Sequence, residues 1–364
     1  MRVRVVDAAT DQRWDEFVRN HPDAGAYQLS AWARVLGGAY GFTPRYLALE
    51  DGNRIAGVLP VMSSYGLVTR RRLRSLPVVG SVGPLATSDE GYRALLEAAC
   101  RLTESTGARS WTLHSRLGGY ERLVPELRLA GGFKTWVAPL PDDAEALRAG
   151  WKKTQNNLWR SLRKADRSGV TARMADGEDD LRRFFALYEE NVRRHRSLPY
   201  SWRLFALTRE LLSEAGVYRL VLAEHGSEVV AGAVLNTFRS NIDLVYNASS
   251  SDHLDLRPNH AVYWHAISWG IENGYRTYTM GQAPEGGSLA RFKQQWGGQP
   301  VDRFRYEFRP GTRADDGANA AQTLRAASTS MDTGDQRASR VAEAWSRTPL
   351  PVLRAAGQLA YRFF

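Results

Sequence analysis

The chain has 364 residues, 43% of them hydrophobic and 24% charged, which is the composition of a globular protein and the length of about two domains. A lone cysteine, Cys100, excludes an internal disulfide, and the seven histidines do not cluster with acids or cysteine at metal-ligand spacings, so no metal is expected. The formal net charge of +10 indicates either a polyanionic partner, such as nucleic acid, a phosphorylated metabolite or an anionic membrane, or a solvated basic surface.

The N-terminal segment has no apolar stretch of the kind that signal peptides carry. No run of the sequence approaches the roughly 18 to 20 apolar residues that a membrane-spanning helix needs. Together with the single cysteine, these features predict a cytoplasmic protein.

The first half of the chain predicts strands followed by a helix and a further strand. Residues 45–62, RYLALEDGNRIAGVLPVM, predict two strands joined by a turn at Asp51 and Gly52. Residues 91–105 have helical spacing, and Gly107 stands where a helix C-cap glycine belongs. Residues 106–113, TGARSWTL, then predict a strand.

A basic stretch separates this half from the next. Residues 143–168 predict one helix that joins two domains and closes at Ser168 and Gly169. Four of its basic residues fall near one face at helical spacing: Lys153, Arg160, Arg163 and Lys164. The face predicts either a phosphate-binding surface, which the family resemblance described below assigns to a tRNA acceptor arm, or a solvated helix between domains.

The second half repeats the pattern of the first. Residues 218–238 predict another strand pair, residues 260–273 a helix, and residues 273–280, NGYRTYTM, match TGARSWTL at an offset of 167. We therefore predict an α/β unit used twice, with domain 1 over residues 1–142 and domain 2 over residues 169–310.

Lysine is scarce in this chain: five of the 49 basic residues are lysine, and one of them is Lys293 in GSLARFKQQWGGQP. The first half has no lysine at the equivalent position. A compact, rotatable ammonium suits a crowded reaction centre better than a planar guanidinium does. The position therefore predicts either a chemical role carried by domain 2 or an ordinary surface lysine on a helix.

The composition of the chain changes after residue 310. Residues 311–336 are small, polar and aperiodic, which predicts a flexible linker. Residues 337–364 return to helical spacing and mix arginine with Leu, Tyr and Phe, which predicts an amphipathic helical tail. The tail either lies on the inner membrane surface or docks on the body of the protein.

Four stretches now point to a family. They are AYQLSAWARVLG (26–37), KKTQNNLWRSLRKADRSGV (152–170), LRPNHAVYWHAISWGIENGYRTYTMGQ (256–282) and LARFKQQWGGQP. Over about residues 10 to 310 the chain resembles the Fem-like transferases. That resemblance implies two tandem acetyltransferase-like (GNAT) domains, the first binding the acceptor and the second catalytic.

The resemblance also implies roles for particular residues. The family's Phe-Lys pair falls on Phe292 and Lys293, with Lys293 stabilising an oxyanion or phosphate and Phe292 packing the adenosine or ribose. The catalytic tyrosine of the family falls on Tyr246, although a core tyrosine is the alternative. The residues assigned to substrate binding are Arg194, Trp32, Arg34 and Asn259. Arg193 and Arg196 are the alternatives to Arg194.

Two details qualify this assignment. Peptidoglycan-building members carry a phosphate-binding lysine four residues after the N-terminal tryptophan, where this chain has Leu36. This departure weighs against a UDP-linked or lipid-linked muropeptide acceptor. In a regular strand Asp243 and Tyr246 lie on opposite faces, so only one of them faces the site, and Tyr246 is favoured.

The resemblance implies an aminoacyltransferase that moves an amino acid from aminoacyl-tRNA, as co-substrate, to an amine acceptor by direct attack. No further cofactor is expected, and charged tRNA and the acceptor are the partners of a monomer. Acetyl-CoA is the co-substrate in the alternative, an acyl-CoA transferase, but residues 255–261, DLRPNHA, lack the glycines of a pyrophosphate cradle. A non-catalytic envelope-assembly protein is the third interpretation.

Overall fold

The computed structural model describes residues 1–66, 70–78, 80–311 and 348–362. The chain forms two compact units. Among the described residues, unit 1 comprises residues 1–133, 302–311 and 355–362, and unit 2 comprises residues 134–301 and 348–354. The linker expected over 311–336 and the first part of the expected tail lie almost wholly outside the described residues.

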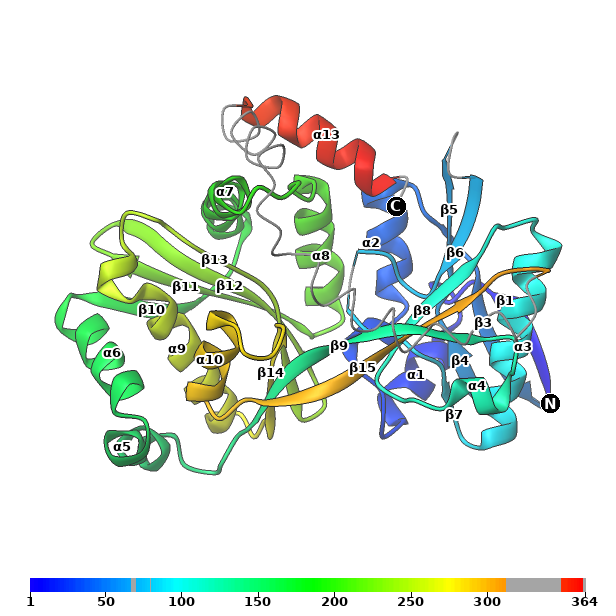
Figure 1. The fold of residues 1–364 in the computed structure, drawn as a ribbon, viewed down its shortest axis with the longest axis horizontal. Helices are drawn as coiled ribbons and strands as arrows, with labels where there is room; N and C mark the ends of the chain where they lie inside the picture. Colours follow the sequence, from blue (N-terminus) through cyan, green and yellow to red (C-terminus); the bar gives the residue numbers. More distant parts are fainter. Residues whose placement is uncertain (67–69, 79, 312–347, 363–364) are drawn as a thin grey trace. The chain divides into compact units, whose positions relative to one another are not determined.

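Unit 1 contains two sheets, and helices α1 (Gln12–Asn20) and α3 (Asp89–Ser105) pack against the one that contains β3 and β4 (Figure 1). One sheet has the strand order β1-β3-β4-β7, and the strands of the other run in the order β15-β8-β6-β5-β2. The elements are β1 (Arg2–Val6), α1 (Gln12–Asn20), α2 (Ala31–Tyr40), β2 (Thr43–Pro44), β3 (Tyr46–Asp51), β4 (Arg54–Leu59), β5 (Met62–Gly66), β6 (Arg70–Arg74), β7 (Leu85–Ala86), α3 (Asp89–Ser105), β8 (Trp111–Ser115) and α4 (Tyr120–Leu123), with the last part of β15 (Gln299–Phe308).

Local signals in the sequence explain the elements of unit 1. The β3–β4 hairpin turns at Gly52, whose φ of 58° is the left-handed conformation that glycine adopts at little cost. Helix α3 begins after Ser88, whose side chain accepts a hydrogen bond from Gly91 N, and ends before Gly107, with φ 62°. The predicted hairpin, helix and C-cap glycine are confirmed.

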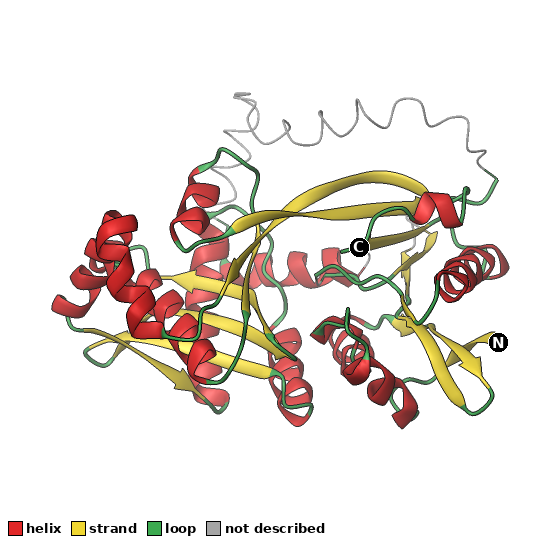
Figure 2. Cartoon of the chain, turned by 90° about the horizontal axis from the view of Figure 1, so that it is seen from below, coloured by secondary structure: helices red, strands yellow, loops and turns green. Residues whose placement is uncertain are grey.

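Unit 2 is built around one sheet with the strand order β10-β11-β12-β13-β14-β9. Its elements are the second part of β9 (Arg128–Pro139), α5 (Ala144–Thr154), α6 (Asn156–Arg167), β10 (Val170–Ala175), α7 (Glu178–Arg194), α8 (Trp202–Glu214), β11 (Tyr218–His225), β12 (Glu228–Phe238), β13 (Asn241–Ser249), α9 (Pro258–Glu272), β14 (Thr277–Gln282) and α10 (Ser288–Gln295). Figure 2 shows these strands and helices by colour.

Helices cover both faces of the sheet in unit 2. Helices α6 and α9 pack on one face, and α7 and α8 lie on the other (Figure 1). Successive residues of β12 alternate between the two faces: Ala233 and Leu235 join the core beneath α9, whereas Gly232 faces Phe184 of α7. A strand with both faces covered is apolar throughout, as β12 is.

The basic segment differs from its prediction. Residues 143–168 form two helices, because Gln155, with φ −137° and ψ 57°, interrupts the helical conformation between α5 and α6. Trp151, Leu158 and Leu162 are buried in the core of unit 2, so the segment belongs to that unit and is not a separate linker. The boundary expected at residue 142 falls between Phe133 and Lys134.

Helix α13 (Leu350–Arg362) lies in the expected tail. Arg354 forms two hydrogen bonds with the carboxylate of Glu189 on α7, and its Nη2 atom donates to Glu189 Oε2 over 2.6 Å. The Glu189 side chain is only 5% exposed. The start of α13 is therefore held by a charge-assisted pair with a buried carboxylate.

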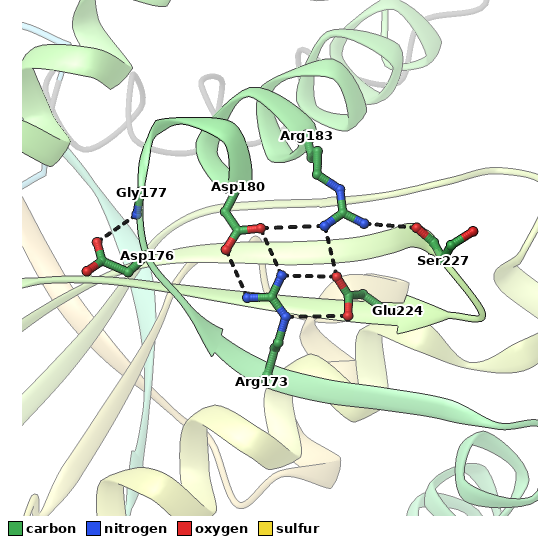
Figure 3. Close-up of polar contacts among 7 residues, drawn as sticks. All are labelled: Arg173, Asp176, Gly177, Asp180, Arg183, Glu224 and Ser227. Carbon is green, nitrogen blue, oxygen red and sulfur yellow. Dashed lines mark hydrogen bonds and ion pairs between the residues drawn. The ribbon is translucent and has the colours of Figure 1, made fainter.

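Two arginines and two carboxylates tie β10, β11 and α7 together (Figure 3). Arg173 on β10 donates to both oxygens of Asp180, each over 2.8 Å, and to Glu224 over 3.1 Å. Arg183 donates to the same Glu224 and to the backbone of Ser227. The hydrogen bonds from Arg173 are the main reason that the pKa values of Asp180 and Glu224 lie below their usual range.

The change Arg173→Leu should lower the free energy of unfolding at pH 7 by about 1–2 kcal/mol, because it leaves both carboxylates short of a partner. A carboxyl group whose pKa is lower in the folded state stabilises the fold above its usual pKa and loses this effect as the pH falls. The difference between variant and wild type in urea unfolding should therefore narrow below about pH 4. An equal difference at pH 3 and pH 7 would contradict this account.

Candidate functional site

The candidate site lies where two parallel strands of unit 2 separate. Strands β13 and β14 pair only between Asn241–Asp243 and Thr277–Thr279, although both strands continue beyond these residues. The backbone of Gly281 then has a φ of 72°, and a Cβ atom added there would lie 3.8 Å from Leu244 O. Beyond the paired residues, β13 still pairs with β12 and β14 with β9, but backbone groups on the edges where β13 and β14 would meet need other partners.

Lys293 supplies such a partner. It projects from α10, is 3% exposed, and its Nζ atom donates to Gly281 O over 3.0 Å and to Gln282 O over 2.9 Å. A surface lysine, the alternative considered from the sequence, is therefore wrong. An ammonium has three N–H donors, so one remains after these two bonds.

The environment of Lys293 changes its titration. Burial lowers the pKa of Lys293 to about 8, because a dry surrounding disfavours the charged form. Near neutral pH the group is still mostly an ammonium, but it can lose its proton within a pH range that many enzymes tolerate. The carbonyl oxygens of Gly281 and Gln282 fix the direction of its remaining N–H group.

Phe292 precedes Lys293 and packs against α9. Its ring centroid is 5.1 Å from that of Tyr263 and 5.3 Å from that of His260, both in edge-on geometry. Trp296 closes the same group of rings, 5.4 Å from Tyr263. This wall holds α10 against α9 and so positions Lys293, while Phe292 itself is half-buried.

The expected alternation of Asp243 and Tyr246 is broken by a β-bulge. In the β12–β13 ladder Asp243 pairs with Asn236, and Tyr246 pairs with Val234, so Val245 is the extra residue. Asn236 and Val234 share one face of β12, and their partners therefore share it too. The two side chains do not lie on opposite faces, as a regular strand predicts; both face the α7–α8 side.

Tyr246 lies in a cluster of aromatic rings on that side. Its ring centroid is 4.7 Å from Phe205, 5.7 Å from Tyr200 and 6.0 Å from Tyr188. The side chain of Tyr246 is half-buried. Its exposure therefore does not decide between a catalytic tyrosine and a core tyrosine, the two interpretations made from the sequence. Its position beside the separating strands keeps it a candidate for the reaction.

Arg194 and Asn259 also belong to unit 2. Arg194 ends α7, is exposed, and donates to Asn191 of the same helix. Asn259 lies in the first turn of α9 and donates to Ser249 Oγ over 3.0 Å, while its Oδ1 atom is buried without a hydrogen-bond partner among the described residues. Both remain candidates for substrate binding.

Trp32 and Arg34 belong to unit 1. Trp32 is fully buried, and its indole Nε1 donates to Ala26 O over 3.0 Å. The ring is part of the core of unit 1, and substrate binding by Trp32 stays a prediction. Arg34, two residues later on α2, is exposed.

The N-terminus of α9 has few free backbone donors. Pro258 is its first residue and has no N–H group, and His260 N donates to Arg257 O. Arg257 itself has a φ of 65°, which is uncommon for a residue with a side chain. This turn lacks the row of free N–H groups with which a glycine-rich loop holds a pyrophosphate.

The basic side chains of α5 and α6 surround an aromatic ring. Lys153, Arg160, Arg163 and Lys164 are all exposed; the last three share α6, whereas Lys153 lies on α5. Arg163 lies over the ring of Trp159 at 5.4 Å. A hollow of about 430 Å³ opens here, lined by Glu145, Arg148, Ala149, Trp159, Arg163, Asp166 and Arg167.

Sequence reasoning missed Asn236. This residue is fully buried, and both polar atoms of its amide lack a hydrogen-bond partner among the described residues. It stands in a row across the sheet with Tyr218, Asp243 and Thr279, on the face that carries Tyr246. A lone amide within the apolar run VVAGAVLNTF was the signal that could have found it.

Comparisons with known proteins agree with this architecture. The family described as acetyltransferase (GNAT) domain matches residues 152–294, which include β13, β14, α9 and Lys293. No curated protein sequence is detected as a relative of the chain.

Solved structures extend the likeness to both units. FemX is similar with a TM-score of 0.69 and 17% identity, covering 85% of this chain and 97% of its own. L-PGS from Bacillus licheniformis follows with a TM-score of 0.57 and 13% identity, over 88% and 97% of the two chains. A tandem GNAT protein from the clavulanic acid biosynthesis pathway has a TM-score of 0.53 and 11% identity, over 85% and 99%.

The chain therefore has the tandem GNAT fold that FemX represents, with a GNAT domain over residues 152–294. The fold class predicted from the sequence is confirmed, and the resemblance to the Fem-like proteins is confirmed at the level of the fold. GNAT domains are an acyltransferase fold, which supports acyl transfer as the class of reaction. None of the described helices is long and apolar enough to span a membrane.

The change Gly281→Ala should lower the free energy of unfolding by about 1–2 kcal/mol, because a residue with a Cβ atom resists a φ of 72°. Gly287→Ala is the control, since Gly287 has ordinary backbone geometry and its nearest neighbour would lie 3.6 Å away. Thermal unfolding measures both. Equal stability of the two variants would show that the strand end is not held in this conformation.

Proposed function

We propose that the protein is an aminoacyltransferase that moves an amino acid from aminoacyl-tRNA to an amine acceptor. The observation that carries the proposal is the buried ammonium of Lys293, held at the point where β13 and β14 separate, with one N–H group left to donate. Among the similar structures, FemX and L-PGS support this class of reaction over others performed on the same fold.

The chemistry needs a positive group at a defined point. The acceptor amine attacks the ester carbonyl carbon of aminoacyl-tRNA, the carbonyl oxygen becomes an oxyanion, and the ester C–O bond then breaks. The amine loses a proton and the ribose hydroxyl gains one, so an amide and free tRNA result. In this proposal the third N–H group of Lys293 stabilises the oxyanion, an interaction that is strong where water is excluded.

Asp243 and Tyr246 are the groups proposed to handle the proton. The bulge at Val245 brings them to one face of β13 next to the separating strands. A carboxylate can accept a proton from the attacking amine, and a phenol can pass one to the leaving hydroxyl. The aromatic neighbours Tyr188 and Tyr200 shield this face from water and favour such a transfer.

Acyl transfer from acetyl-CoA is the second candidate, because the GNAT family matches residues 152–294. The start of α9 argues against it. Pro258 removes one donor and Arg257 O occupies another, at the turn where a pyrophosphate would need several. The two candidates differ in a direct assay, which supplies purified protein and an amine-bearing cell extract with either radiolabelled aminoacyl-tRNA or radiolabelled acetyl-CoA.

The basic surface of α5 and α6 is proposed to bind the tRNA phosphates. Arg160, Arg163 and Lys164 are exposed on one helix, and Trp159 lies among them as a ring on which a base can stack. Lys153 extends the same surface from α5.

The change Lys293→Met should lower kcat for aminoacyl transfer by about 100-fold or more, because it removes the donor to the oxyanion. Binding of tRNA should stay unchanged. Lys134→Met is the control for replacing a half-buried lysine of the same unit. Turnover by the folded Lys293→Met variant within about tenfold of wild type would exclude the proposed role.

The rate should also fall as the pH rises through about 8, because the Lys293 ammonium is then lost. The direction follows because the protonated form of Lys293 is the one that stabilises the oxyanion. The alkaline limb of the pH–rate profile should therefore fall above this pKa. A rate that continues to rise to pH 10 would show that the neutral amine, and not the ammonium, is the active form.

The combined change of Arg160, Arg163 and Lys164 to Gln should weaken tRNA binding and reduce the slope of log K against log salt by about 2 to 3. A triple change of Arg93, Arg101 and Arg122 in unit 1, all exposed, removes the same charge elsewhere. Filter binding across a salt series measures both. The same loss of slope in both variants would assign the effect to net charge and not to this surface.

A further inference from the structure

A row of basic side chains lies on one face of a sheet in unit 1. In the β8–β15 ladder His114 is opposite Arg305, and in the parallel β6–β8 pair Arg74 is opposite Thr112. Residues that pair across strands, and alternate residues of one strand, project to the same face. Arg72, Arg74, His114 and Arg305 therefore share a face.

The other face of the same strands is the apolar core. Leu73, Trp111, Leu113 and Tyr306 alternate with the basic residues and are all buried in the core beneath α3. The basic face is instead partly open: Arg305 is exposed, and the three others are half-buried. Solvent, and a ligand, can thus reach these cations.

Two of these basic groups have lowered pKa values. Burial is the main cause of the lowered pKa of Arg74, and Arg72 and Arg305 lower it further. Burial lowers the pKa of His114 to about 4, with Arg305 and Arg74 contributing. Arg72 and Arg305 therefore lie close enough to Arg74 for their positive charges to act on it.

One polar group of the row is left without a partner. The Nε atom of Arg72 is buried and has no hydrogen-bond partner among the described residues. Glu307 shares the basic face, opposite Thr112, but its carboxylate accepts a hydrogen bond from Arg309 Nε over 2.9 Å. The row thus offers donors that an oxyanion could use.

We propose that Arg72, Arg74, His114 and Arg305 bind the phosphate group of a small phosphorylated molecule on unit 1. A tetrahedral oxyanion has several acceptor oxygens and up to two negative charges, which suits the guanidinium groups that β6 and β15 present on one face, with His114 of β8 between these strands. The edge of Phe133, whose ring centroid is 5.7 Å from that of His114, borders the site on one side.

The place of this site in the repeat supports a binding role. The repeat offset relates Thr112 of unit 1 to Thr279 of unit 2, and each stands at the end of a parallel strand pair. Opposite Thr112 is Arg74, whereas opposite Thr279 is Asp243. Unit 1 therefore carries a basic residue where unit 2 carries an acidic one. The proposed phosphate site does not rest on the proposal that the protein transfers amino acids.

The test is titration calorimetry of the full-length protein with sulfate, whose charge is constant between pH 5 and 8. Arg74→Gln should weaken sulfate binding by about tenfold or more, as should the exposed change Arg305→Gln, whose folding is not at risk. Arg71→Gln is the matched control. Arg71 lies on the same strand but projects to the other face, where it donates to Thr106 O.

Weaker sulfate binding in Arg74→Gln and Arg305→Gln, but not in Arg71→Gln, supports the site. No sulfate binding by the wild type, or equal weakening by all three changes, overturns it. Displacement of sulfate by pyrophosphate supports a small phosphorylated ligand. Displacement by tRNA and not by pyrophosphate would overturn that identity and assign the phosphate to a nucleic acid.

Discussion

Backbone hydrogen bonding imposes the constraint on which the site in unit 2 depends. Once β13 and β14 stop pairing after Asp243 and Thr279, β14 loses its neighbour on that edge, although its other edge still pairs with β9 at Gln282. Two carbonyl groups at the end of β14 accept hydrogen bonds from Lys293, and the ring contacts of Phe292 and Trp296 hold the helix that carries it. The same feature opens the strands and places a buried cation between them.

The bulge at Val245 determines which side chains of β13 lie beside the point where the strands separate. By inserting one residue into β13, it turns Tyr246 to the face that already carries Asp243 and Asn236. A regular strand would have divided these polar groups between two layers of helices. The arrangement therefore gathers groups that can carry a proton on one side of the opening, while the cation approaches on α10.

Much of the fold could be predicted from the sequence, because its signals are local. The glycines at 52 and 107 marked a turn and a helix end, and the repeated strand pattern indicated two similar units. The burial of Trp32 and Lys293 could not be predicted, since it depends on residues distant in sequence. The break at Gln155 and the bulge at Val245 were missed for a related reason: neither has a glycine or proline to mark it.

Strands β9 and β15 each begin in one unit and end in the other. A fragment cut at residue 133 would lose the part of β15 that pairs with β8, and would expose an edge from Trp111 to Ser115. A fragment that starts at residue 134 would contain the residues 152–294 that match the GNAT family. It would also contain the part of β15 that pairs with β8, but not β8 itself. No single cut in the chain therefore yields both units with all of their strands.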